Sequence, residues 1–111
     1  MNSFNVDSSF FSGCQALCRV LRSNRSIRRL YLDGNRFNDD CAQSFAELFS
    51  QNEHITYINL NKNFFENETT GRLFGQSLGE NQSLEEFHCA FNRLTSKACG
   101  YLIKSLTTNA R

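Results

Sequence analysis

A repeated apolar pattern that includes an asparagine constrains the fold of this chain more than any other feature. Three segments match it, starting at Ile27, Ile55 and Leu84, so their spacing along the chain is almost constant. Each segment has apolar residues at its first, fourth, sixth and eleventh positions and asparagine at its ninth. Self-similarity at a fixed period is the signature of a repeat architecture, in which each unit buries its apolar face against its neighbours.

The first half of each segment predicts a short β-strand. Apolar residues two positions apart have the period of a strand with one buried face. Asn35, Asn63 and Asn92 follow where the chain turns away from the strand. Because an amide has donors and an acceptor, it can satisfy backbone groups that a tight, buried turn would leave unpaired. Stacked units should therefore form a parallel sheet with a line of asparagines beside it.

The residues between these segments predict helices. Apolar residues recur three and seven positions before each of four asparagines, and a small residue recurs ten positions before each. These asparagines are Asn24, Asn52, Asn81 and Asn109. The spacing traces one face of a helix. The predicted helices span 8–23, 39–52, 67–80 and 95–108, with Asp39 and Ser96 as N-caps for the second and fourth.

The predicted fold class is α/β, because strands that run parallel need crossover connections, here helical and right-handed. We expect a right-handed βα solenoid with about three short parallel strands and four helices. On this pattern residues 27–94 resemble leucine-rich repeats, and the 28–29-residue unit resembles the ribonuclease-inhibitor-like class. That class includes ribonuclease inhibitor, the Ran GTPase-activating protein, tropomodulins and the repeat regions of NOD-like receptors. The resemblance implies a horseshoe segment with strands on its concave side, largely intracellular members, and protein binding through the concave surface or its rims.

The repeat also predicts the domain organisation. We expect a single leucine-rich repeat domain over 1–111, with an N-terminal helix or cap over 1–26 and repeats over 27–54, 55–83 and 84–111. Residues 1–7 do not match the strand pattern. The sequence stops where a fourth repeat strand would start, so the last predicted strand should have an open outer edge. A fragment of a longer repeat protein, self-association through this edge, and an edge covered by a partner all remain open.

Composition excludes several classes of partner. The net charge of +1 gives no overall attraction to nucleic acid or to an anionic membrane. No stretch approaches the roughly 18 apolar residues of a membrane-spanning helix, and the N-terminus lacks the pattern of a secretory signal. We therefore expect a cytoplasmic protein with no nucleic-acid and no membrane partner.

A basic run covers the first predicted helix and the following turn. Its residues are Arg19, Arg22, Arg25, Arg28 and Arg29. Acidic residues follow closely, and no aromatic residues alternate with the arginines. The favoured interpretation is a solvated helix face with neighbouring ion pairs, with binding of nucleic acid or of an acidic partner as the alternative.

The cysteines and histidines do not predict a catalytic or metal site. Cys14 and Cys18 have a chelating spacing on a helix, yet they occupy the positions of small packing residues in the other units, and Cys99 does the same. Cys41 has no explanation from the pattern. His88 has only Glu86 and an alanine as same-face neighbours on its strand, which gives no nucleophile–base pair. We predict a protein that is not an enzyme, with no cofactor and no metal.

The outward positions of the three strands are the predicted binding surface, which we call the strand face. They are Arg29, Tyr31, Asp33, Tyr57, Asn59, Asn61, Glu86, His88 and Ala90. Tyrosine and arginine are enriched at protein interfaces. Phe64 and Phe91 fall outside the buried positions, so they either form an exposed apolar patch at the edge of this face or pack on each other.

These features predict a non-catalytic protein–protein interaction module that binds another protein through its concave strand face. A solvated sheet face without a partner is the plainer interpretation of the same residues. Two alternatives remain. One is a regulator of a small GTPase, which follows from the resemblance to the Ran GTPase-activating protein. The other is a fragment of a larger repeat protein.

Overall fold

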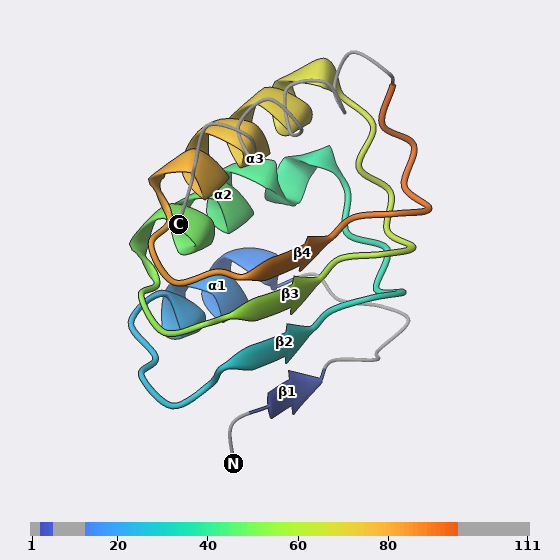
Figure 1. Cartoon of the computed structure of the whole chain (residues 1–111). Helices are drawn as coiled ribbons and strands as arrows, with labels where there is room; N and C mark the ends of the chain where they lie inside the picture. The colour runs from blue at the N-terminus through green and yellow to red at the C-terminus, as the bar shows by residue number, and fades with distance from the viewer. Residues whose placement is uncertain (1–2, 6–12, 96–111) are drawn as a thin grey trace.

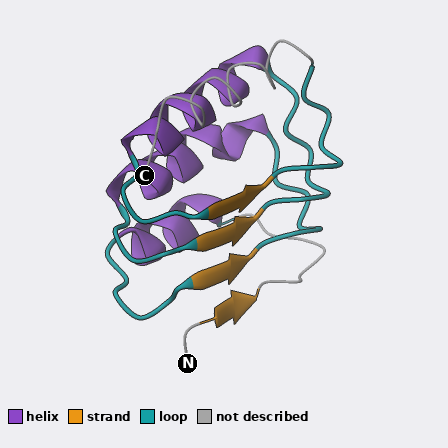
Figure 2. Ribbon diagram, in the orientation of Figure 1, coloured by secondary structure: helices purple, strands orange, loops and turns teal. Residues whose placement is uncertain are grey.

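The fold is one parallel sheet with helices on one side. The computed structural model describes residues 3–5 and 13–95 of the 111. Four strands pair in chain order, and the helices form a layer against one face of the sheet (Figures 1 and 2). The strands are β1 (Ser3–Asn5), β2 (Arg29–Tyr31), β3 (Tyr57–Asn59) and β4 (Glu86–His88). The helices are α1 (Cys14–Arg22), the short 3-10 helix η1 (Asp39–Cys41), α2 (Ala42–Gln51) and α3 (Glu68–Glu80).

The predicted α/β class is confirmed, and so are the three parallel strands β2, β3 and β4. The predicted helices over 39–52 and 67–80 match α2, with η1 before it, and α3. The first helix starts later than predicted, at Cys14, because Gly13 is not helical and stands at its N-cap. Apart from Thr95, which is not helical, the predicted helix over 95–108 lies outside the described residues. No helix in the described part of the chain is long and apolar enough to cross a membrane.

A fourth strand was missed. The prediction that residues 1–7 do not match the strand pattern was wrong, because Ser3–Asn5 form β1, with Phe4 opposite Leu30. The register reveals the reason: the first unit is shorter than the later ones, and Ser9 replaces the expected asparagine. Because the first unit has neither the asparagine nor the period of the later units, its strand does not fit the repeat pattern. Pairing with β2 then supplies the backbone hydrogen bonds that such a short strand lacks by itself.

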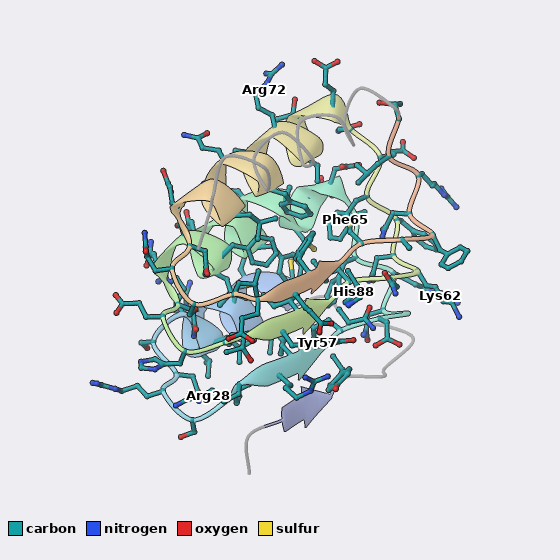
Figure 3. All side chains as sticks on the ribbon, in the orientation of Figure 1. Arg28, Tyr57, Lys62, Phe65, Arg72 and His88 are labelled. Carbon is teal, nitrogen blue, oxygen red and sulfur yellow. The ribbon has the colours of Figure 1, made fainter. Side chains whose placement is uncertain are left out.

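Phenylalanine rings fill the space between the sheet and the helices. The rings are those of Phe37, Phe45, Phe49, Phe65, Phe74 and Phe87, and neighbouring centroids lie 5.1 to 6.3 Å apart, mostly edge to face. Figure 3 shows Phe65 in this layer. Edge-to-face contacts add to the free energy gained by burying the rings. The units that begin at Ile27, Ile55 and Leu84 each contribute at least one of these rings, so the aromatic core joins the units.

Two asparagines of the predicted line, Asn63 and Asn92, each join their unit to the one before it. The Oδ1 atom of Asn63 accepts the backbone N–H groups of Asn35 and Phe37, at 3.1 and 3.0 Å. Its Nδ2 atom donates to the carbonyl oxygens of Leu32 and Leu60, at 3.1 and 3.0 Å. One buried amide thus satisfies the turn of its own unit and the turn of the preceding unit.

A second line of asparagines, to which the sequence assigned no role, lies at the opposite edge. The Oδ1 atom of Asn52 accepts the N–H groups of His54 and Ile55, both at 2.8 Å, and its Nδ2 atom donates to the carbonyl of Leu21 at 2.8 Å. Asn81 makes equivalent bonds one unit later. Asn52 and Asn81, two of the asparagines from which the helical spacing was counted, therefore bridge successive units.

The prediction that Asp39 is the N-cap of its own helix was wrong. The side chain of Asn38 caps η1 by accepting the N–H of Asp40 at 3.0 Å. The Asp39 carboxylate instead accepts the N–H of Asn67 at 3.0 Å and the hydroxyl of Thr70. Because the 3-10 helix η1 precedes α2, Asp39 points toward the next unit and supports the start of α3. The other predicted cap, Ser96, lies outside the described residues.

Replacing Asn63→Ala should lower the free energy of unfolding by about 3 kcal/mol, because it leaves several buried backbone groups without partners. Urea denaturation followed by far-UV circular dichroism measures the change. Gln82→Ala removes an exposed amide and should change stability by less than about 0.5 kcal/mol. Equal stabilities for the two variants would contradict the bridging role of Asn63.

Candidate functional site

The strand face is the side of the sheet opposite the helices (Figure 1). The register of the strands places Tyr31, Asn59 and His88 in one row across the sheet, as their equivalent positions in the three segments predict. Arg29, Tyr57 and Glu86 form the row beside it. Alternation along each strand explains the arrangement, since the residue between these two rows points into the core.

Tyr57 is the centre of an aromatic row. Its ring centroid lies 5.1 Å from that of Tyr31 and 5.2 Å from that of His88, with the rings tilted at 43° and 45°. Figure 3 labels Tyr57 and His88 on neighbouring strands. Ring contacts therefore continue from β2 across β3 to β4. The contacts are diagonal, because Tyr57 is in the other backbone row, and such diagonal neighbours are within reach of aromatic side chains.

Arg29 is held against both tyrosines. Its guanidinium carbon lies 4.0 Å from the centre of the Tyr57 ring and 5.5 Å from the centre of the Tyr31 ring. Its Nε atom donates to the Tyr31 hydroxyl at 2.7 Å, and this hydrogen bond raises the pKa of Arg29. The guanidinium held in this way remains exposed on the strand face.

The other end of the row carries an acid–imidazole pair. The Nε2 atom of His88 lies 3.0 Å from Oε2 of Glu86, and the two side chains are 44% and 60% exposed. An exposed pair of this kind contributes little to stability. Its effect is to set the orientation of the imidazole beside Tyr57. We call the contacting side chains of Arg29, Tyr31, Tyr57 and His88 the aromatic row, although they come from both backbone rows of the sheet.

The asparagines of the strand face have a second role in the backbone. Asn61 accepts the N–H of Ala90 at 2.6 Å, and Asn59 accepts the N–H of Asn61 at 2.9 Å. Both side chains are half-buried, whereas Asp33 is exposed. The sequence predicted all three as partner contacts. The structure shows that Asn61 also extends the pairing between the β3 and β4 segments, whereas the Asn59 bond stays within its own segment.

Phe64 and Phe91 lie at the edge where the strands end. Phe64 is 38% exposed, and the guanidinium carbon of Arg93 lies 4.6 Å from its ring centre. Phe91 is 78% exposed. Among the described residues no ring contact joins the two, so the structure favours separate exposed side chains over two rings packed on each other.

The backbone at Phe91 is strained. Gly34, Lys62 and Phe91 occupy equivalent positions before the pattern asparagine, and their φ angles are +72°, +61° and +58°. Glycine adopts this left-handed conformation freely, but a bulky side chain there is an outlier. Figure 3 shows Lys62 at this edge, pointing away from the sheet. The turn thus holds Phe91 in an unfavourable conformation with its ring in solvent.

The buried cysteines form part of the core. Cys14, Cys18 and Cys41 are all buried, and Cys41, which the pattern did not explain, hydrogen-bonds with Cys14. Burial raises the pKa of Cys18 to about 12, and burial with that hydrogen bond raises the pKa of Cys41 to about 12. Protonated thiols are poor nucleophiles and poor metal ligands. Within residues 3–5 and 13–95, no group of three potential ligands is placed to hold a metal, and Cys99 lies outside this part.

Sequence comparison finds similarity to short parts of long proteins. No family model matches the chain. It is 31% identical over 110 residues to mouse Tonsoku-like protein and 28% identical over 86 residues to mouse baculoviral IAP repeat-containing protein 1e. The two alignments cover 89% and 78% of this chain. The chain spans only 8% and 6% of the length of these relatives.

Solved structures share the fold. The chain is similar to leiomodin-1 actin-binding site 2, with a TM-score of 0.83, 24% identity, and coverage of 98% of this chain and 65% of that one. It is also similar to the tropomodulin C-terminal domain from Caenorhabditis elegans, with a TM-score of 0.56, 14% identity, and coverage of 98% and 84%. At these identities the likeness shows a shared fold.

Proposed function

We propose that the chain is a leucine-rich repeat solenoid of the ribonuclease-inhibitor-like class. Units of nearly constant length, each with a strand followed by an asparagine turn and joined by helices, support this assignment. Two lines of asparagine bridges between successive units support it further. The proposed repeats span 27–54, 55–83 and 84–111. The N-terminal unit over 1–26 contributes β1 as well as a helix.

We further propose that the chain is a protein-binding module, and the observation that carries this proposal is the aromatic row. Arg29, Tyr31, Tyr57 and His88 contact one another in series across three strands. Arginine and tyrosine dominate the binding energy of many interfaces. Contacts between these side chains hold them in place before a partner arrives, which lowers the entropy lost on binding. A solvated sheet face would need no such series of contacts.

Phe64 and Phe91 extend the surface to the edge where the strands end. An exposed apolar ring gains free energy when a partner covers it. Phe91 is held at positive φ in a position that glycine fills in another unit. Strain of this kind is often found at functional sites. A bulky ring at this strained position supports a role in binding rather than in folding.

Actin is the first partner to test. The structural neighbour with the higher TM-score is an actin-binding site of leiomodin-1. That likeness supports the choice of partner for the experiment, whereas the surface residues support the proposal of protein binding. The alternative of a small-GTPase regulator has no support from the described geometry, and a GTP-hydrolysis assay with candidate GTPases separates it from the module proposed here.

Replacing Tyr31→Ala and Tyr57→Ala together should weaken binding to the partner by at least about 2 kcal/mol, because the change removes the central rings and the support of Arg29. Cosedimentation with actin filaments and affinity capture from a cell lysate measure the loss. Val20→Ala is the matched control, since Val20 is 67% exposed on α1, away from the strand face. Retained binding by the tyrosine variant, with Val20→Ala behaving like the parent, would exclude this surface.

Replacing Phe91→Gly should have opposite effects on folding and binding. Glycine relieves the left-handed strain, so the free energy of unfolding should rise by about 1 kcal/mol. The same change removes an exposed ring, so affinity for the partner should fall. Thermal unfolding and the binding assays above measure both quantities. Lys62→Gly is the control for strain alone and should stabilise the fold without loss of binding. If both variants bind the partner equally well, Phe91 is not part of the binding surface.

A further inference from the structure

A basic hollow lies at the edge where the helices end and the chain enters the strands. Its volume is about 550 Å³, and three arginines and a histidine from two successive units line it: Arg19, Arg22, Arg25 and His54. Figure 1 shows that α1 and α2 end at the same side of the molecule, where the loops lead into β2 and β3. Stacking therefore brings His54 beside arginines of the preceding unit.

The hollow carries excess positive charge. Arg22 forms an ion pair with Glu47 at 3.1 Å, and Glu53 is the acidic residue of the lining. Arg19 and Arg25 are exposed, and neither has an ion pair among residues 3–5 and 13–95. Like charges gathered on one surface repel one another. An anion in the hollow would relieve that repulsion and accept hydrogen bonds from the guanidinium groups.

Packing of the repeat does not explain these arginines. The positions equivalent to Arg19 hold glutamate and glutamine in the next two units, and those equivalent to Arg25 do the same. The positions equivalent to Arg22 hold serine and glycine. A basic side chain in the last turn of a helix offsets the helix dipole, which accounts for Arg19 and Arg22. It does not account for Arg25, which follows the helix, or for the histidine contributed by the second unit.

We propose that this hollow is a second binding site, separate from the aromatic row, that takes the carboxylate groups of an acidic peptide segment. Planar guanidinium groups match oxyanions such as carboxylate or phosphate in pairs of parallel hydrogen bonds. The observations favour a peptide over nucleic acid. The lining contains no phenylalanine or tyrosine to stack on nucleic-acid bases.

The test is isothermal titration of the whole chain with hexaglutamate peptide, inorganic phosphate and a short single-stranded DNA. The double variant Arg19→Gln/Arg25→Gln should bind hexaglutamate about tenfold more weakly than the parent. Arg72→Gln is the matched control, because Arg72 lies on the outer side of α3 (Figure 3) and should leave the affinity unchanged. Tyr31→Ala/Tyr57→Ala should also bind the peptide like the parent. Circular dichroism verifies that each variant is folded.

Several results would overturn the proposal. These are an absence of hexaglutamate binding to the parent, equal affinities for the parent and the double arginine variant, and an equal loss in Arg72→Gln. Tighter binding of DNA than of the peptide would instead indicate a nucleic-acid site. Tighter binding of phosphate, with the loss in the double variant confined to phosphate, would indicate a site for the free anion. A loss of peptide binding in the tyrosine variant would mean that the peptide occupies the strand face and not the hollow.

Discussion

The rest of the structure depends on asparagine amides that bridge successive units at both edges of the sheet. Asn63 joins two turns at the edge where the strands end, and Asn52 joins two loops at the edge where they start. Both amides are almost fully buried. Stacked units bring backbone groups together away from water, and each group needs a partner there. An amide with donors and an acceptor supplies partners to both units at once, which fixes their spacing.

That spacing determines what each side of the sheet can do. Residues that alternate along a three-residue strand place Ile58 in the core and Tyr57 on the opposite side. The helix side becomes a continuous phenylalanine core, and the other side becomes a row of tyrosine, arginine and histidine contacts. The same register therefore stabilises the fold and arranges the proposed binding surface. Side chains on this face are held both by their own strand and by the next unit, as Arg29 is by Tyr31 and by Tyr57.

Much of this architecture was predictable, because the repeat shows which residues are equivalent. The strands β2 to β4, the burial of Cys14 and Cys18, and the row of Tyr31 with His88 follow from period and alternation. β1 was missed because its unit is shorter and lacks the asparagine. The support that Asp39 gives to α3 was missed because a 3-10 turn redirects its side chain toward another unit. This contact joins residues of two units, and the local pattern around Asp39 gives no sign of it.

The sequence by itself determined the repeat, the class of fold and the two faces of each strand, because burial of apolar residues at a regular period leaves few other arrangements. Only the tertiary structure decided how side chains from different units meet. It placed Arg29 against two tyrosines, set Arg93 beside the ring of Phe64, and gathered His54 and Arg25 around one hollow. These contacts depend on distances and rotamers across the stack, and a linear pattern contains neither.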